Sequence, residues 1–185
     1  MNTLKKPAVA IILSIALVIG STLLSGSAKL KKDIQQVSDG FYNGVTYDGY
    51  THPSIYSQLN NIIGAVDGMC AIAKNNGYNA NELSNASYYL KSNLSTMHDY
   101  ISSIYWSYSE LCDALTSFKP KIDSMELNER DSEGMEKYWE TISNAQRVIE
   151  SAGYNESVRN YKNAMGIPAE FIADICDVYG PEYFA

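Results

Sequence analysis

Hydrophobic residues beyond about residue 53 recur at steps of three and four, and no run of Val and Ile alternates with polar residues. Such steps place apolar side chains on one face of a helix, whereas a half-buried strand needs a period of two. The pattern therefore predicts an all-α fold in which each helix buries one face against its neighbours.

Two long helices are expected first. One should cover about residues 54–75, with Ser54 near its N-cap and Asn75-Asn76-Gly77 at its end. The next has the most regular pattern, because apolar residues follow one another from Leu83 to Phe118. That spacing predicts a single helix of about 36 residues with a coiled-coil-like seam, which Pro120 should end. The polar stretch 126–134 should form the turn back.

A further helix is expected to begin between Ser132 and Met135. Its apolar face rotates after Gly153, where a bend costs little because glycine tolerates unusual backbone angles. Gly166-Ile167-Pro168 should stop it, and a short helix over about residues 169–177 should follow. That helix would cover the others with three apolar residues, namely Phe171, Ile172 and Ile175. Together these segments predict an antiparallel bundle of long helices.

The first part of the chain has no charge over 22 residues, from Pro7 to Ala28. In a helix these residues reach about 33 Å, just more than the roughly 30 Å of a bilayer's hydrocarbon core. We therefore expect a transmembrane anchor in residues 1–28, with residues 8–28 in contact with lipid, and a helical domain in residues 29–185. Residues 29–38 should continue the anchor helix, and a Gly-rich loop over 39–53 should follow.

A cleaved secretory signal is the alternative for this segment. Lys5 and Lys6 precede the apolar run, and Gly26-Ser27-Ala28 resembles a cleavage site. The lysines on the two sides of the run nearly balance, so the positive-inside rule does not fix the orientation. Because the segment is also similar to an export signal, we expect a single-pass protein of the cell membrane whose helical domain lies outside the cytoplasm.

Charge narrows the range of partners. From Asp33 onward, nine Lys and Arg face 21 Asp and Glu, a net charge of −12. A surface so acidic repels phosphate backbones, so nucleic acid is not an expected partner.

Side chains that support catalysis or metal binding are scarce. His52 and His98 have no His or Cys at ligand spacing, and Cys70, Cys112 and Cys176 are far apart and lie beside apolar stripe positions. The chain contains no Walker loop, GxSxG or dinucleotide-binding motif. We therefore expect no enzymatic activity, no catalytic residue, no cofactor and no metal.

One aromatic cluster is a candidate for binding. Tyr108 belongs to the apolar seam, whereas Tyr105 and Trp106 lie partly outside it. Amphipathic rings outside a core stripe are enriched at binding surfaces. Tyr105 and Trp106 are therefore predicted interaction residues, and contact with a neighbouring helix is the alternative.

The C-terminal residues resemble a known signature. They include Tyr154, Asn155, Val158, Tyr161, Pro168, Ala173, Tyr183 and Phe184, and Phe41-Tyr42-Asn43-Gly44-Val45 follows the uncharged run. This set is similar to that of the LemA family, bacterial proteins with one N-terminal transmembrane helix and a helical soluble domain. The run Gln58-Leu59-Asn60-Asn61-Ile62 stands where the family has a different motif. The resemblance implies a divergent, membrane-associated helical protein without an established activity or cofactor.

Two classes of function fit these features. The first is a membrane-anchored structural or interaction protein, whose bundle contacts a partner protein or a second copy of itself. The second is a membrane-tethered sensor or accessory domain that holds a small molecule between its helices. A core cavity of several hundred Å³ would favour the second class. A filled core with an exposed aromatic strip would favour the first.

Overall fold

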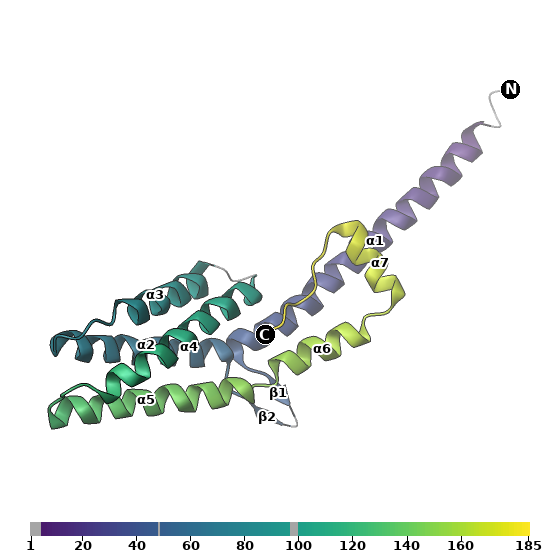
Figure 1. The fold of residues 1–185 in the computed structure, drawn as a ribbon. Coiled ribbons are helices and arrows are strands. Elements are labelled where there is room, and N and C mark those ends of the chain that lie inside the picture. Colours follow the sequence, from purple (N-terminus) through teal and green to yellow (C-terminus); the bar gives the residue numbers. More distant parts are fainter. Residues whose placement is uncertain (1–4, 48, 97–99) are drawn as a thin grey trace. The chain divides into compact units, whose positions relative to one another are not determined.

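The computed structural model describes residues 5–47, 49–96 and 100–185, with only the backbone given for residues 5–13 and Tyr47 (Figure 1). The mainly helical fold expected from the sequence is confirmed. The elements in the described residues are α1 (Lys5–Asn43), β1 (Thr46–Tyr47), β2 (Tyr50–Thr51), α2 (Ile55–Asn75), α3 (Asn81–Thr96), α4 (Ile101–Asp123), α5 (Glu129–Glu150), α6 (Tyr154–Ala164) and α7 (Ile167–Cys176).

The chain divides into two compact units. Unit 1 contains residues up to Ser38 together with Arg159–Pro181, and unit 2 contains Asp39–Val158 together with Glu182–Ala185. Most of α1 therefore belongs to unit 1, whereas α2, α3, α4 and α5 belong to unit 2.

Unit 2 is built on a bundle of four consecutive antiparallel helices, α2 to α5 (Figure 1). Helix α2 packs against both α5 and α3, and α3 packs against α4. The expected helix at residues 54–75 is confirmed as α2. The Ser54 hydroxyl caps it by accepting a hydrogen bond from the Ser57 N–H at 3.0 Å, and Leu59, Ile62 and Met69 are buried on its inner face.

The single helix expected from Leu83 to Phe118 is wrong. The structure has two antiparallel helices there, because α3 ends at Thr96 and α4 begins at Ile101. Most of the described apolar residues of the expected seam are nevertheless buried, in both helices, and Leu94 and Ile101 lie seven residues apart, close to two helical turns. The apolar spacing therefore continues from α3 into α4, and the sequence between the two helices contains no glycine or proline. Met97 of the expected seam lies outside the described residues.

Two boundaries around the next connection also differ from expectation. Pro120 lies inside α4, which continues to Asp123, since a proline in the last turn removes only one hydrogen bond. Helix α5 begins at Glu129 rather than within residues 132–135. The Asn128 side chain accepts a hydrogen bond from the Asp131 N–H at 3.0 Å, and acids in the first turn suit the positive end of the helix.

The sequence predicted one helix that bends at Gly153 and ends near Gly166, but the structure has two helices there, since α5 ends at Glu150 and α6 begins at Tyr154. Gly153, the predicted site of the bend, lies between them with a φ of +69°. The final short helix also exists as α7, but Pro168 lies in its first turn instead of preceding it. The prediction that this helix covers the other helices with its apolar residues is wrong, since Phe171 is 61% exposed and Ile175 is 52% exposed. Within unit 1, α7 approaches α1 closely at Gly26, where a Cβ atom would lie 2.7 Å from the Ile172 Cδ1.

Helix α1 continues beyond the uncharged run, as predicted, and it extends through Asp39 and Gly40 to Asn43. The expected loop is thus shorter and contains the antiparallel hairpin β1–β2, in which Thr46 pairs with Thr51. Asp48 lies outside the described residues, as do residues 1–4 of the predicted anchor. Within the described part of the chain, no helix has the length and apolar character needed to cross a membrane. The transmembrane assignment stays a prediction.

Candidate functional site

A groove of about 520 Å³ lies between α3 and α4 in unit 2. Six residues line it, namely Tyr89, Asn93, Ser103, Trp106, Ser107 and Glu110. Tyr89 and Asn93 lie one helical turn apart on α3, and the other four occupy successive turns on one face of α4. The antiparallel pairing of these two helices therefore creates the groove.

The floor of the groove is polar and closely packed. The Asn93 side-chain NH₂ donates a hydrogen bond to the Ser107 hydroxyl, which in turn donates to the Ser103 carbonyl at 3.2 Å. Ser107 is buried. These bonds join α3 to α4 below the groove and leave hydroxyl and amide groups facing its interior.

The walls of the groove are aromatic and exposed. The Trp106 side chain is 69% exposed and that of Tyr89 is 58% exposed. Tyr88 on α3 and Tyr100 at the start of α4 are also exposed. A tryptophan that loses so little of its surface on folding contributes little to the core, which makes this face a candidate contact surface.

The structure separates the two predicted interaction residues. Trp106 lines the groove, but Tyr105 is half-buried and packs its ring against Phe184, with centroids 5.2 Å apart. Neighbouring residues on a helix point about 100° apart, so the two side chains serve different surroundings. Tyr105 belongs to an internal cluster rather than to the groove.

That internal cluster brings together aromatic residues from distant parts of the sequence. The Phe184 ring lies 5.5 Å from the rings of both Phe41 and Tyr108, and Phe41 lies 5.7 Å from Tyr154. Phe41 is fully buried, and Tyr154 is 1% exposed. These rings attach the last residues of the chain to the end of α1, to α4 and to the start of α6, all within unit 2.

Polar contacts hold the same C-terminal residues in place. Asn155 forms two hydrogen bonds with the Phe184 backbone, because its side-chain oxygen accepts from the N–H and its NH₂ donates to the carbonyl, both at 2.8 Å. The Tyr154 hydroxyl donates to the Glu182 carbonyl at 2.8 Å. The Glu182 carboxylate accepts from the N–H and hydroxyl of Ser102 in the first turn of α4. We call residues 182–185 with these partners the C-terminal clamp.

The other residues of the predicted signature have separate positions. Val158 is buried in unit 2, and Tyr183 is half-buried there. Tyr161 and Pro168 belong to unit 1. Burial, and then the charge of Asp33, raises the pKa of Tyr161. The signature therefore unites Tyr154, Asn155 and Phe184 in one contact network, whereas Tyr161 and Pro168 are outside it.

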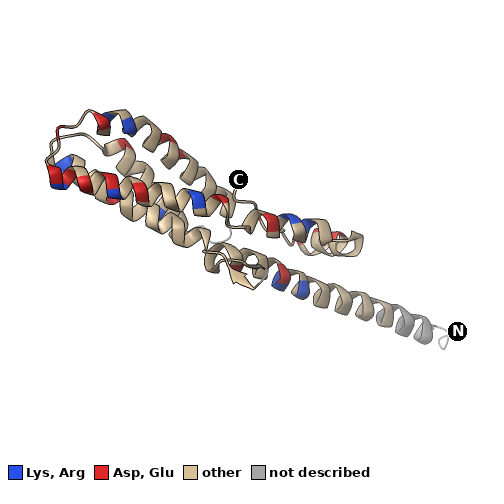
Figure 2. Ribbon diagram, turned by 90° about the horizontal axis from the view of Figure 1, so that it is seen from below, with Lys and Arg blue, Asp and Glu red and all other residues tan. Residues whose placement is uncertain are grey.

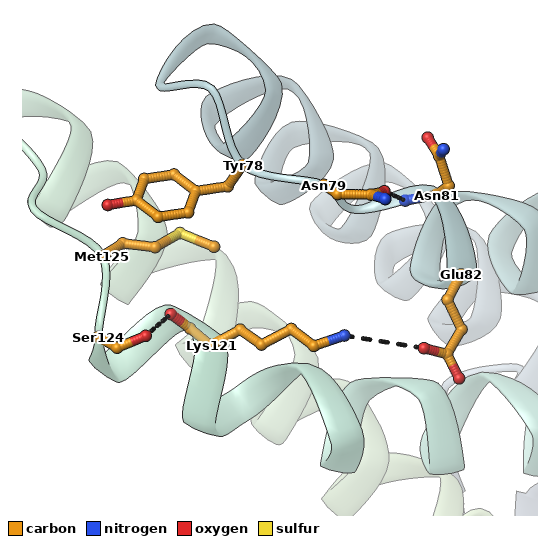
Figure 3. Close-up of a pocket in the computed structure, with 7 residues that line it drawn as sticks. All are labelled: Tyr78, Asn79, Asn81, Glu82, Lys121, Ser124 and Met125. Atoms are coloured by element: carbon orange, nitrogen blue, oxygen red, sulfur yellow. Dashed lines mark hydrogen bonds and ion pairs between the residues drawn. The ribbon is translucent and has the colours of Figure 1, made fainter.

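A second, smaller pocket of about 350 Å³ lies at the far end of unit 2 (Figure 3). The ring of Tyr78 lies beside the Met125 side chain at one end of this pocket. At the other end Lys121 Nζ lies 3.8 Å from a carboxylate oxygen of Glu82. Because both charged side chains are largely exposed, this ion pair is a weak, water-screened contact.

The thiols of Cys70 and Cys112 have the surroundings of structural cysteines. Burial, with a further effect of Asp67, raises the pKa of Cys70 to about 11. Burial also raises the pKa of Cys112, and burial together with Cys112 raises that of Tyr108. A high pKa keeps a thiol protonated at neutral pH, where only the thiolate is a strong nucleophile. Within the described residues, no three His, Cys, Asp or Glu side chains gather as metal ligands.

Charged residues are distributed along the outer faces of the helices. Figure 2 shows acidic and basic residues interspersed along α5. Unit 2 has 17 Asp and Glu against seven Lys and Arg, so its surface is acidic overall. The groove follows this balance, because Glu110 is the charged residue among the six that line it.

Comparisons with known proteins give no relative for this chain. No family model matches it, and the searches of curated proteins and of solved structures also return no match. The LemA resemblance stays a prediction.

Proposed function

We propose that this protein is a membrane-tethered helical bundle that binds a partner protein through the groove between α3 and α4, without catalysing a reaction. The observation that carries the proposal is the exposure of Trp106 beside Tyr89 over a polar floor. The apolar residues between the helices of unit 2 are buried, as in a packed core. An exposed aromatic strip outside a packed core is typical of a protein contact surface.

The membrane tether is part of the proposal and rests mainly on the sequence. The uncharged residues Pro7–Ala28 lie within one continuous helix, α1. Ile15, Leu17 and Leu24 on this helix are more than half exposed, and lipid would cover such side chains. We also propose that the bundle lies outside the cytoplasm. In addition, we propose that the chain is related to the LemA family. The contact network of Tyr154, Asn155 and Phe184, three residues of the predicted signature, supports this relationship.

The pocket in Figure 3 supports a second candidate function, the binding of a small molecule between helices. Its volume of about 350 Å³ falls in the range of small-molecule sites, and Tyr78, Met125 and Lys121 offer both apolar and charged contacts. This pocket lies away from Trp106, so the two candidates predict different sensitive residues.

Capture of partners from solubilised membranes tests the proposal. The tagged full-length protein should retain a partner that Trp106→Ala releases. Tyr88→Ala is the matched control, because Tyr88 is equally exposed on the neighbouring helix but does not line the groove. If Trp106→Ala keeps every co-purifying protein, the groove is not the contact surface. Loss of a bound small molecule on Lys121→Ala alone would favour the second candidate.

A further inference from the structure

The groove between α3 and α4 has the composition of a site for a cationic side chain. Trp106 and Glu110 are four residues apart on α4, so their side chains are neighbours on one face. The Trp106 indole offers a π face and Glu110 offers a carboxylate, and Tyr89 offers a second ring from α3. A cation above an aromatic face and beside a carboxylate gains from both groups.

The negative charge in and around the groove favours a positively charged ligand. Glu110 is the charged residue of the groove lining, and the unit around it carries 17 acids against seven bases. An acidic partner would be repelled by this field, whereas a basic one would be attracted before contact. The hydroxyl and amide oxygens of Ser103, Ser107 and Asn93 can accept hydrogen bonds from a cation's N–H groups.

Among biological cations, arginine fits this arrangement best. Its planar guanidinium stacks on an aromatic ring and pairs with a carboxylate at the same time, and its several N–H groups suit a floor of oxygen acceptors. Lysine has a compact, strongly hydrated charge that does not stack in this way. We propose that the groove binds an arginine-bearing segment of a partner protein, with the guanidinium between Trp106 and Glu110. This inference rests on the proposed function and names the chemistry of its partner.

Binding of a short fluorescein-labelled peptide of Arg and Ser to the full-length protein, followed by fluorescence anisotropy, tests the inference. Counterparts with citrulline or Glu in place of Arg have a neutral or an opposite charge. The Arg peptide should bind, and the other two should bind at least tenfold more weakly. Trp106→Leu keeps an apolar side chain but removes the π face. It should weaken the binding of the Arg peptide by roughly 2- to 30-fold.

The decisive comparison is Glu110→Gln with Asp113→Asn. Both remove one negative charge from an exposed position on α4, but only Glu110 lines the groove. We expect Glu110→Gln to weaken Arg-peptide binding several-fold more than Asp113→Asn does. Equal effects would mean that the acidic surface as a whole attracts the peptide and that the groove is not a specific site. This result would overturn the inference. Equal binding of the citrulline peptide would overturn it as well.

Failure of this inference is distinguishable from failure of the proposed function. If Trp106→Ala releases a captured partner but the Arg peptide shows no dependence on Glu110, the groove binds a protein of other chemistry. The occupant could also be a second copy of this chain, which carries the exposed basic residues Lys29, Lys31 and Lys32. Concentration-dependent dimers that both Glu110→Gln and Lys31→Glu dissociate would assign the groove to self-association and overturn a separate partner.

Discussion

Gly64 and Gly68 lie about one turn apart on α2 and have opposite surroundings. A Cβ atom at Gly68 would overlap the Tyr138 ring, because this ring of α5 lies directly against α2 there. At Gly64, none of the described side chains of other elements lies within 4 Å of the same position. Gly68 therefore allows the close packing of α2 on α5, whereas Gly64 has no such role.

This contrast makes a pair of matched substitutions. Gly64→Ala should raise the free energy of unfolding by up to about 1 kcal/mol, since alanine is the better helix former. Gly68→Ala should be about 1 to 3 kcal/mol less stable than Gly64→Ala, because the new methyl group displaces the Tyr138 ring. Urea unfolding followed by circular dichroism measures both values. In a Tyr138→Ala background the two substitutions should become equivalent, and a remaining difference would contradict the explanation.

Between elements, the C-terminal clamp depends most on Asn155, whose amide pairs with both backbone groups of Phe184. Asn155→Ala should lower the free energy of unfolding by about 1 to 3 kcal/mol, because a partly buried donor and acceptor lose their partners. Asn160→Ala on the exposed face of the same helix is the control and should have little effect. If both variants unfold at the same urea concentration, residues 182–185 are not held as the structure indicates.

The sequence predicted helices better than it predicted their ends and contacts. Periodicity reports which face of a helix is buried, so α2 and a change of the buried face at Gly153 were predictable, although the end of α5 before Gly153 was not. It does not indicate that α3 ends and α4 begins, because the apolar spacing continues from Leu94 to Ile101. Contacts of the C-terminal clamp join residues far apart in the chain, such as Ser102 and Glu182, and local patterns do not report such pairs.

The groove was partly predictable for the same reason. Trp106 is off the apolar stripe, which indicated its exposure. Glu110 follows it by one helical turn, so this neighbour was also accessible to sequence reasoning and was missed. Tyr89 was not, because one long helix over residues 83–118 would place it far from Trp106, and only the antiparallel packing of α3 on α4 brings the two to one groove.

At the scale of the whole molecule, the chain leaves unit 2 after Val158, forms the second part of unit 1, and returns for its last four residues. The return is fixed by the aromatic cluster around Phe184 and by the C-terminal clamp. Unit 2 also contains weak acids that are buried or half-buried, among them Tyr154 and Tyr108 of the aromatic cluster and the thiols of Cys70 and Cys112. Their ionisation connects the stability of unit 2 to pH.

Stability should therefore fall at alkaline pH. Burial raises the pKa of Tyr154, Tyr108, Cys70 and Cys112, so the folded protein keeps protons that the unfolded chain releases. Below about pH 8 both states are protonated at these groups, and their contribution to stability is complete and constant. Above about pH 9 the unfolded chain binds fewer protons than the folded protein, so the free energy of unfolding decreases as pH rises, by up to about 1.4 kcal/mol per pH unit for each group.

Urea midpoints measured between pH 7 and pH 10.5 should show this decline. Tyr154→Phe removes one of the titrating groups and should make the decline shallower, although it lowers stability at pH 7 by removing the hydrogen bond to the Glu182 carbonyl. A midpoint that stays constant or rises over this range would show that these side chains are not buried as the structure places them.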